Sequence, residues 1–177
     1  MEGLRTFYGS PVSEHADRHL DLIGMGRLLA LSPSAQLNAL ACLRYASEFG
    51  RGRVYALDTS REQSARSARN VAQQPGYRLF GDQVTYGQLA SMVAKGAEMR
   101  RTRLTESFGF EDYLADNAAE LVPLFAVSPE GRLRMFLPDR KPEPEAGWSI
   151  LALGPAREVA KQPGRKQKVA KEQRIAD

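Results

Sequence analysis

This sequence of 177 residues has very little cysteine and no long uninterrupted apolar run. It contains one cysteine, Cys42, which excludes an internal disulfide and suits a reducing cytoplasm. Its longest uncharged stretch, residues 28–43, is interrupted by Pro33 and by polar residues, so it cannot cross a bilayer as a helix. Residues 1–7 contain no apolar run that would make a signal peptide. A disulfide-stapled secreted fold and a membrane span of its own are therefore excluded.

Histidine is also scarce: the chain has only His15 and His19. Four residues apart, they share one helical face near Glu14 and Asp17, and that spacing can bind a metal. Zinc sites, however, usually take three or four protein ligands, and no third histidine is available. We therefore predict local ion pairs on a solvated helix face and no metal site. Cys42 lies in an apolar helical pattern and the carboxylates are scattered, so we predict no catalytic group and no enzyme.

The net charge is concentrated at the end of the chain. From Arg157 onward there are seven basic and three acidic residues, an excess that equals the net charge of +4 for the whole chain. The rest of the chain is neutral overall, which argues against a nucleic-acid-binding domain. The end segment also lacks aromatic residues that could stack on bases. We predict a disordered basic tail at 155–177, with weak binding to RNA or anionic lipid headgroups as the alternative.

The first third of the chain alternates short apolar runs with helical patterns. Ser32 is expected to cap a helix that has Pro33 in its first turn. Apolar residues cover much of the circumference of that helix, which favours burial between other elements. Strands and helices alternating through short connections predict a parallel sheet with right-handed crossovers. The expected strands span 4–8, 28–31 and 54–57, and the expected helices span 12–23 and 34–49.

A second pattern begins after the polar residues 58–76, which fit either a linker or an exposed helix. Thr85 and Gln88 have the spacing of a capping box, and Ser-Pro-Glu-Gly at 128–131 is typical of a hairpin turn. Strands are expected at 77–80, 97–106, 122–127, 132–137 and 148–153, and helices at 85–95 and 110–117. We therefore expect an α/β chain: a partial Rossmann-like sheet at 1–58, a linker or exposed helix at 59–76, a small α+β unit at 77–154 and the tail at 155–177.

Two predicted strand-to-helix junctions carry the residues best suited to a ligand. Gly9 and Ser10 follow the first predicted strand, and Ser32 follows the second. Open parallel sheets bind ligands outside the carboxyl ends of their strands, where helix N-termini present N–H groups. The sequence has no GxGxxG motif, so from the residues alone ordinary capping and turn chemistry is favoured over nucleotide binding.

Several stretches are similar to a known family. The relevant stretches are Phe7-Tyr8-Gly9, SEHADRHL at 13–20, GMGRLLALS at 24–32, LNALA at 37–41, EFGR at 48–51 and Val54-Tyr55. They resemble the later half of a Trk-type nucleotide-binding domain, or RCK domain, in the copy fused behind the membrane domain of bacterial sodium(potassium)/proton antiporters. LTESF at 104–108, PLFAV at 123–127 and GRL at 131–133 resemble the segment that follows there. The resemblance covers roughly residues 3–154.

The resemblance implies a cytoplasmic regulatory region on the inner face of a bacterial inner membrane. Such regions dimerise and convert ligand binding into a conformational bias on an attached transmembrane antiporter domain. The resemblance gives Gly9, Ser10, Ser32 and Asn38 ligand-binding positions, although Ser10 stands where the family has an acid. The family's first two strands and glycine loop precede Leu4, so Met1 is expected to be an internal position, and an adenine nucleotide or NAD(H) would need that missing half.

Other functions remain as alternatives. A free-standing dimeric module that binds a small ligand or a protein fits the residues, as does a nucleic-acid-associated protein acting through the tail. A half-sheet exposes the side of its first strand, so we expect pairing with another chain, and we expect no specific nucleic-acid partner.

Overall fold

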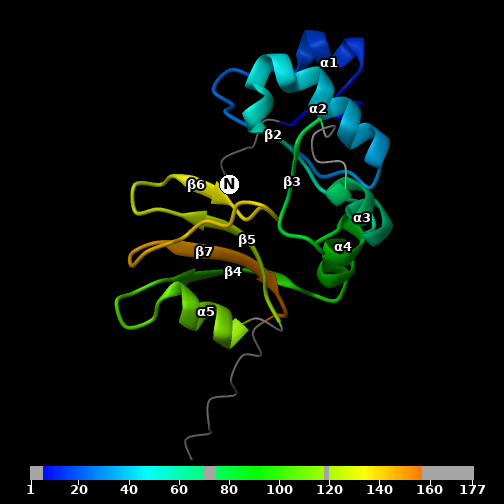
Figure 1. The fold of residues 1–177 in the computed structure, drawn as a ribbon. Coiled ribbons are helices and arrows are strands. Elements are labelled where there is room, and N and C mark those ends of the chain that lie inside the picture. The colour runs from blue at the N-terminus through cyan, green and yellow to red at the C-terminus, as the bar shows by residue number, and fades with distance from the viewer. Residues whose placement is uncertain (1–5, 70–74, 118–119, 157–177) are drawn as a thin grey trace, which may run out of the picture.

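A computed structural model describes residues 6–69, 75–117 and 120–156 (Figure 1). The predicted tail lies outside the described residues from 157 onward. The first elements are α1 (Glu14–His19), β1 (Leu28–Ala30), α2 (Ala35–Phe49), the 3-10 turn η1 (Arg51–Arg53), β2 (Val54–Ala56), α3 (Arg61–Arg69) and β3 (Tyr77–Arg78). They are followed by α4 (Tyr86–Ala94), β4 (Glu98–Arg103), α5 (Phe110–Asn117), β5 (Val122–Val127), β6 (Leu133–Met135) and β7 (Ser149–Gly154).

The first three strands form a parallel sheet in the order β1-β2-β3. Successive side chains point to opposite faces, so Val54 packs toward α2 while Tyr55 packs on the other side of the sheet. The core on the α2 side contains Ala30, Ala41, Cys42, Tyr45, Phe49 and Val54. Covering both faces is the usual requirement of a parallel sheet, and it explains why β1 and β2 contain no charged residue.

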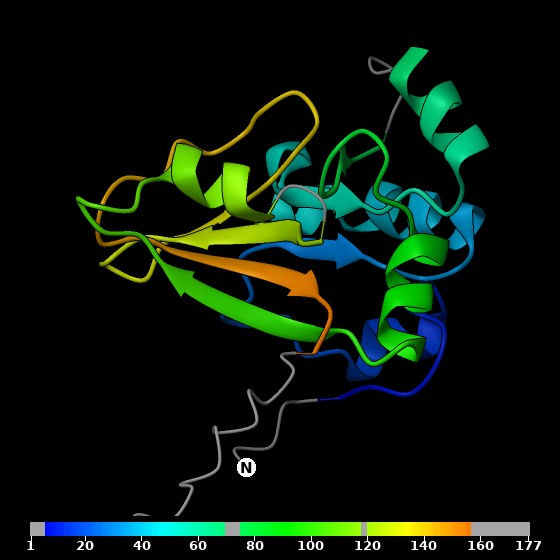
Figure 2. The same ribbon diagram turned by 90° about the horizontal axis from the view of Figure 1, so that it is seen from below.

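The remaining four strands form an antiparallel sheet in the order β4-β7-β5-β6. The predicted hairpin between β5 and β6 is confirmed: Gly131 N–H donates to the Ser128 carbonyl over 2.9 Å, and Phe125 pairs with Met135. Helix α5 lies against one face of this sheet (Figures 1 and 2). The core beneath it contains Leu104, Tyr113, Leu121, Ala126, Phe136, Ile150 and Ala152.

The two sheets share a third core. It joins residues of the parallel sheet and its connections to residues of the antiparallel sheet, namely Tyr55, Leu57, Leu79, Phe80, Leu124, Met135, Leu137 and Leu153. Leu89 and Met92 of α4 pack against the same cluster. The layers therefore run from α1 and α2 through the parallel sheet and the shared core to the antiparallel sheet and α5.

Several predicted elements are confirmed and several are wrong. Helices at 34–49 and 110–117 and the strand at 122–127 are present within a residue of their predicted bounds. The strand at 4–8 is wrong for its described residues 6–8, because the fully exposed Tyr8 has no partner strand and Phe7 instead packs on the His15 ring. The third parallel strand is β3, which the sequence suggested for a second unit.

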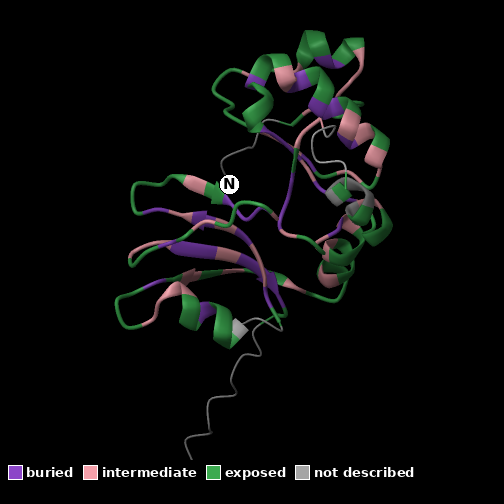
Figure 3. Cartoon of the chain, in the orientation of Figure 1, coloured by how far each residue is buried: buried purple, intermediate pink, exposed green. Residues whose placement is uncertain are grey.

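The predicted helix at 12–23 shortens to α1, and the cap predicted at Ser32 belongs to Ser34. Ser34 accepts from Leu37 N–H over 3.3 Å, whereas the Ser32 hydroxyl bonds only to the backbone of Ser34. Helix α2 is also less buried than its composition suggests, because Leu40 and Leu43 are exposed. Figure 3 shows exposed and buried stretches side by side along this helix.

The segment 58–76 resolves in favour of an exposed helix over part of its length, since α3 spans Arg61–Arg69. Thr85 is the N-cap of α4, as predicted, and accepts from Gln88 N–H over 3.3 Å. The chain is thus a mixed α/β protein, and its proposed division into units stays a prediction. No helix within the described residues is long and apolar enough to span a bilayer.

Candidate functional site

Asn38 fixes the loop at the carboxyl end of β1. This residue of α2 is 3% exposed, and its side-chain carbonyl oxygen accepts from Ser32 N–H over 3.0 Å. Its amide donates to the Ser32 carbonyl over 3.0 Å and to the Leu57 carbonyl over 3.2 Å. Both amide hydrogens are therefore used by the protein backbone. Asn38 acts here by tying the ends of β1 and β2 together.

The start of α2 completes this edge. Ser34 caps the helix, and its first turn contains no acidic residue. The N-terminus of a 15-residue helix carries the positive end of its dipole, and no carboxylate on its first turn compensates that potential. The loop from Ser32 to Ser34 is therefore electrostatically suited to an anionic group.

A buried ion pair lies at the same end of the next two strands. Asp58 comes two residues after β2, and its carboxylate accepts from Arg78 Nε of β3 over 3.0 Å, with each side chain 7% exposed. Arg78 also donates to the Asp82 carbonyl over 3.4 Å. Asp58 binds α4 as well, because its carbonyl accepts from Tyr86 N–H over 2.8 Å. The pair neutralises the carboxylate and joins β2, β3 and α4.

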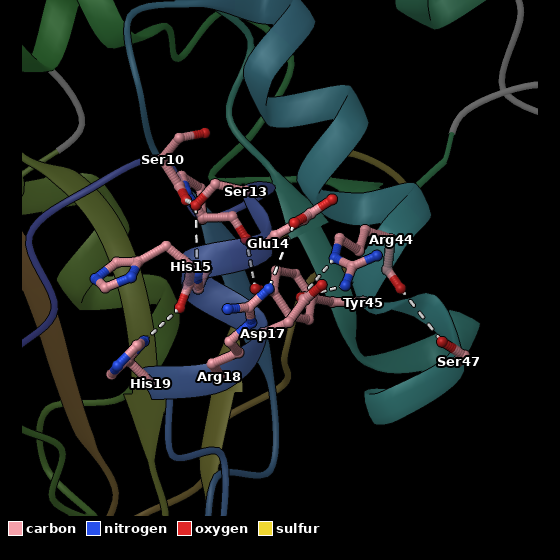
Figure 4. Close-up of polar contacts among 12 residues, drawn as sticks. Ser10, Ser13, Glu14, His15, Asp17, Arg18, His19, Arg44, Tyr45 and Ser47 are labelled. Carbon is pink, nitrogen blue, oxygen red and sulfur yellow. Dashed lines mark hydrogen bonds and ion pairs between the residues drawn. The ribbon is translucent and has the colours of Figure 1, made fainter.

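Gly9 and Ser10 lie elsewhere, beside the start of α1 (Figure 4). The Ser10 carbonyl accepts from the Ser13 hydroxyl over 2.8 Å, and the neighbouring Pro11 carbonyl accepts from Tyr45 over 2.5 Å. Tyr45 lies seven residues after Asn38, roughly 10 Å along the axis of α2. Of the four predicted site residues, the structure brings Ser32 and Asn38 together and holds Gly9 and Ser10 toward the other end of the helix.

A cavity of about 410 Å³ is lined by residues of α1, of the segment that follows it and of α2 in this second region. The carboxylate of Asp17 pairs with Arg44, whose Nε donates over 3.1 Å, and this hydrogen bond raises the pKa of the guanidinium. Burial raises the pKa of Tyr45. Because Asp17 and Arg44 are each about 40% exposed and satisfy one another, the region is best explained as the contact that docks α1 onto α2.

The two histidines also lie on α1. Their ring centroids are 4.0 Å apart, and His19 Nδ1 lies 2.9 Å from the His15 carbonyl oxygen. Glu14 pairs with Arg18 at 3.6 Å, an exposed local ion pair of the predicted kind. No group of three metal-ligating side chains occurs within the ranges that the structure describes.

Sequence reasoning missed Asp58 and Arg78. The available signal was weak but real: an aspartate directly after a buried strand stands at the carboxyl edge of a parallel sheet, and an arginine inside a short apolar strand needs a partner. Comparison with known proteins finds no matching family model, no similar curated protein and no similar solved structure.

Proposed function

We propose that this chain is the cytoplasmic regulatory region of a monovalent cation/proton antiporter. It performs no chemistry of its own. It biases transport by dimerising and by sensing a small ligand at the carboxyl edge of a partial Rossmann-like sheet. An adenine nucleotide or NAD(H) is the ligand class when the missing first half of the domain is supplied. The transporter domain belongs to the same longer protein, and the region lies on the inner face of the bacterial inner membrane.

The observation that carries the proposal is the arrangement of residues at the carboxyl edge of the parallel sheet. Ser32 is held by two hydrogen bonds to the Asn38 side chain, one donated by Ser32 N–H and one accepted by the Ser32 carbonyl, next to a helix N-terminus whose first turn has no acid. The Asp58 carboxylate that could repel an anion is already paired with Arg78. An edge with these properties suits the phosphate of a nucleotide. The attached transporter is inferred from the resemblance in the sequence. The core that the two sheets share connects this edge to the antiparallel sheet.

Binding is tested by thermal melting of the purified chain with ATP, ADP, AMP, NAD⁺ and NADH, with mass measured by light scattering. A ligand at 100 times its dissociation constant stabilises the fold by about 2.7 kcal/mol, which is readily measured as a shift in melting temperature. We expect a dimeric mass. A shift with at least one nucleotide would show that the half-site on this chain binds without the missing strands.

The matched variants are Ser32→Asp and Ser10→Asp, which place one negative charge at each of the two predicted regions. Ser32→Asp should abolish the nucleotide shift by repulsion at the α2 edge, whereas Ser10→Asp should leave it intact. A shift lost equally in both variants contradicts a nucleotide site at the Ser32 edge. No shift of the native chain with any nucleotide would mean that the half-site on this chain does not bind a nucleotide without the missing strands.

A further inference from the structure

Phe80 has a backbone conformation that a bulky residue rarely adopts. Its φ is 67°, and it is the one non-glycine residue with positive φ among those the structure describes. The residue lies two positions after the end of β3 and is 6% exposed. Strained residues of this kind persist only where the surrounding structure holds them, and they cluster at functional positions.

The contacts that hold Phe80 come from the antiparallel sheet. Its N–H donates to the Phe136 carbonyl, just after β6, over 2.8 Å. Its ring packs edge-to-face on Phe125 of β5, with centroids 5.4 Å apart and an interplanar angle of 83°. Edge-to-face packing is a preferred geometry of aromatic pairs, so both the backbone and the ring of Phe80 are fixed to the second sheet.

The residues just before Phe80 are fixed to the first sheet. Leu79 N–H donates to the Ala56 carbonyl at the end of β2 over 3.0 Å, and Arg78 is bound to Asp58. A movement of the carboxyl ends of β2 and β3 is therefore passed, one residue later, to β5 and β6. Because packed cores shift between discrete arrangements, a short connection of this kind transmits such a movement.

We infer that Phe80 is a strained joint that makes the two sheets open as one cooperative unit. The joint gives the candidate edge, at which Asn38 and Asp58 lie, a direct mechanical route to the antiparallel sheet. Only the use of this route by a ligand rests on the proposed function. The joint itself is a property of the chain without ligand, and it is tested without one.

The test is native-state hydrogen exchange of the ligand-free full chain, followed by NMR in increasing denaturant. Leu57 and Leu79 report on the parallel sheet, since their N–H groups donate to Ala30 and Ala56. Leu104 and Phe136 report on the antiparallel sheet, since theirs donate to Trp148 and Leu124. In the native chain we expect all four amides to exchange through one common opening reaction.

Phe80→Ala should separate the two pairs of amides by about tenfold or more in exchange rate. Phe110→Ala is the matched control, because it removes the same ring from the core under α5 alone. It should accelerate all four amides together. The inference would be contradicted if the four amides of the native chain exchanged through separate opening reactions. It would also be contradicted if all four still exchanged through one reaction in the Phe80→Ala chain. If Phe80→Ala does not fold, Phe80→Leu should show a smaller separation in the same direction.

The strain has its own readout. Glycine adopts positive φ freely, whereas alanine does not, so Phe80→Gly should melt at a higher temperature than Phe80→Ala. At an ordinary buried position the order is the reverse, because glycine loses more conformational entropy on folding. A Phe80→Gly chain that melts below Phe80→Ala would show that the conformation is not strained.

Discussion

At the residue scale, Asn38 illustrates how a predicted ligand contact can be a structural residue. Its side-chain amide is hydrogen-bonded to backbone groups of Ser32 and Leu57, which follow the ends of two neighbouring strands. Any ligand at this edge would therefore meet the loop that Asn38 shapes. The residue acts as a positioning residue, and its loss should be measured first as a loss of stability.

Replacement of Asn38 by leucine should lower the free energy of unfolding by about 2–4 kcal/mol, because it removes the partner of the part-buried backbone groups of Ser32 and of the buried Leu57 carbonyl. Ser32→Ala is the control. It removes only a hydroxyl that bonds within its own turn, so its cost should stay below about 1 kcal/mol. Urea unfolding of the three chains measures both values, and equal costs would contradict the positioning role of Asn38.

Cys42 is the residue whose titration the fold controls most clearly. Its side chain is fully buried, its Sγ lies 3.6 Å from the Tyr55 carbonyl oxygen, and burial raises the pKa of the thiol to about 11. In the unfolded chain the thiol ionises at lower pH. Between these two pKa values the unfolded state binds fewer protons than the folded state, so stability falls as pH rises.

The native chain should therefore lose about 2–3 kcal/mol of stability relative to Cys42→Ala between pH 8 and pH 11. The comparison with Cys42→Ala removes the titration of tyrosines and lysines, which both chains share. Denaturant unfolding at intervals of pH gives the two curves. Parallel curves would mean that the thiol ionises as easily in the folded chain as in the unfolded one.

At the scale of elements, the ion pair between Asp58 and Arg78 determines how β2 meets β3. The strand β3 has two residues, and its partner is parallel, so its backbone pairing alone is weak. A buried ion pair contributes little net stability over an apolar pair, but it strongly penalises the loss of one partner. We therefore expect this contact to set the register of β3.

Arg78→Met should cost about 3–5 kcal/mol, because it removes the cationic partner of a carboxylate that is 7% exposed. Arg44→Met is the matched control: it breaks the half-exposed pair with Asp17 and should cost far less, because water screens that pair. The double variant Asp58→Leu with Arg78→Met should recover part of the loss. Equal melting temperatures for the Arg78→Met and Arg44→Met chains would contradict this account.

The elements that the sequence predicted well are those with strong local signals. The apolar period of α2, the Thr85 cap and the hairpin at 128–131 all depend on neighbouring residues. The strand expected at 4–8 was wrong because a strand requires a partner, and partners are not a local property. The same reason explains β3, whose membership of the parallel sheet depends on contacts with β2 and on Asp58, 20 residues earlier.

At the scale of the whole molecule, the division into a sheet unit and a later α+β unit hides a shared core. Tyr55 and Leu57 of the first part contact the same cluster as Leu124 and Leu153 of the second. Sequence patterns identify which residues are buried, but they do not show which buried faces meet. The sequence indicated only part of the candidate edge for the same reason. Ser32 and Asn38 are close in sequence, whereas Asp58 and Arg78 are 20 residues apart and were missed.

The central claim is that this chain regulates a cation/proton antiporter, and proton flux tests it most directly. Inverted membrane vesicles from the source organism are loaded with a pH-sensitive dye, and flux is started with Na⁺ or K⁺, with and without nucleotide. Vesicles with the native locus are compared with vesicles lacking codons 28–154, with transporter abundance matched by immunoblot. We predict cation-dependent flux that responds to nucleotide only when the region is present. Identical flux and an identical nucleotide response in both would contradict the account.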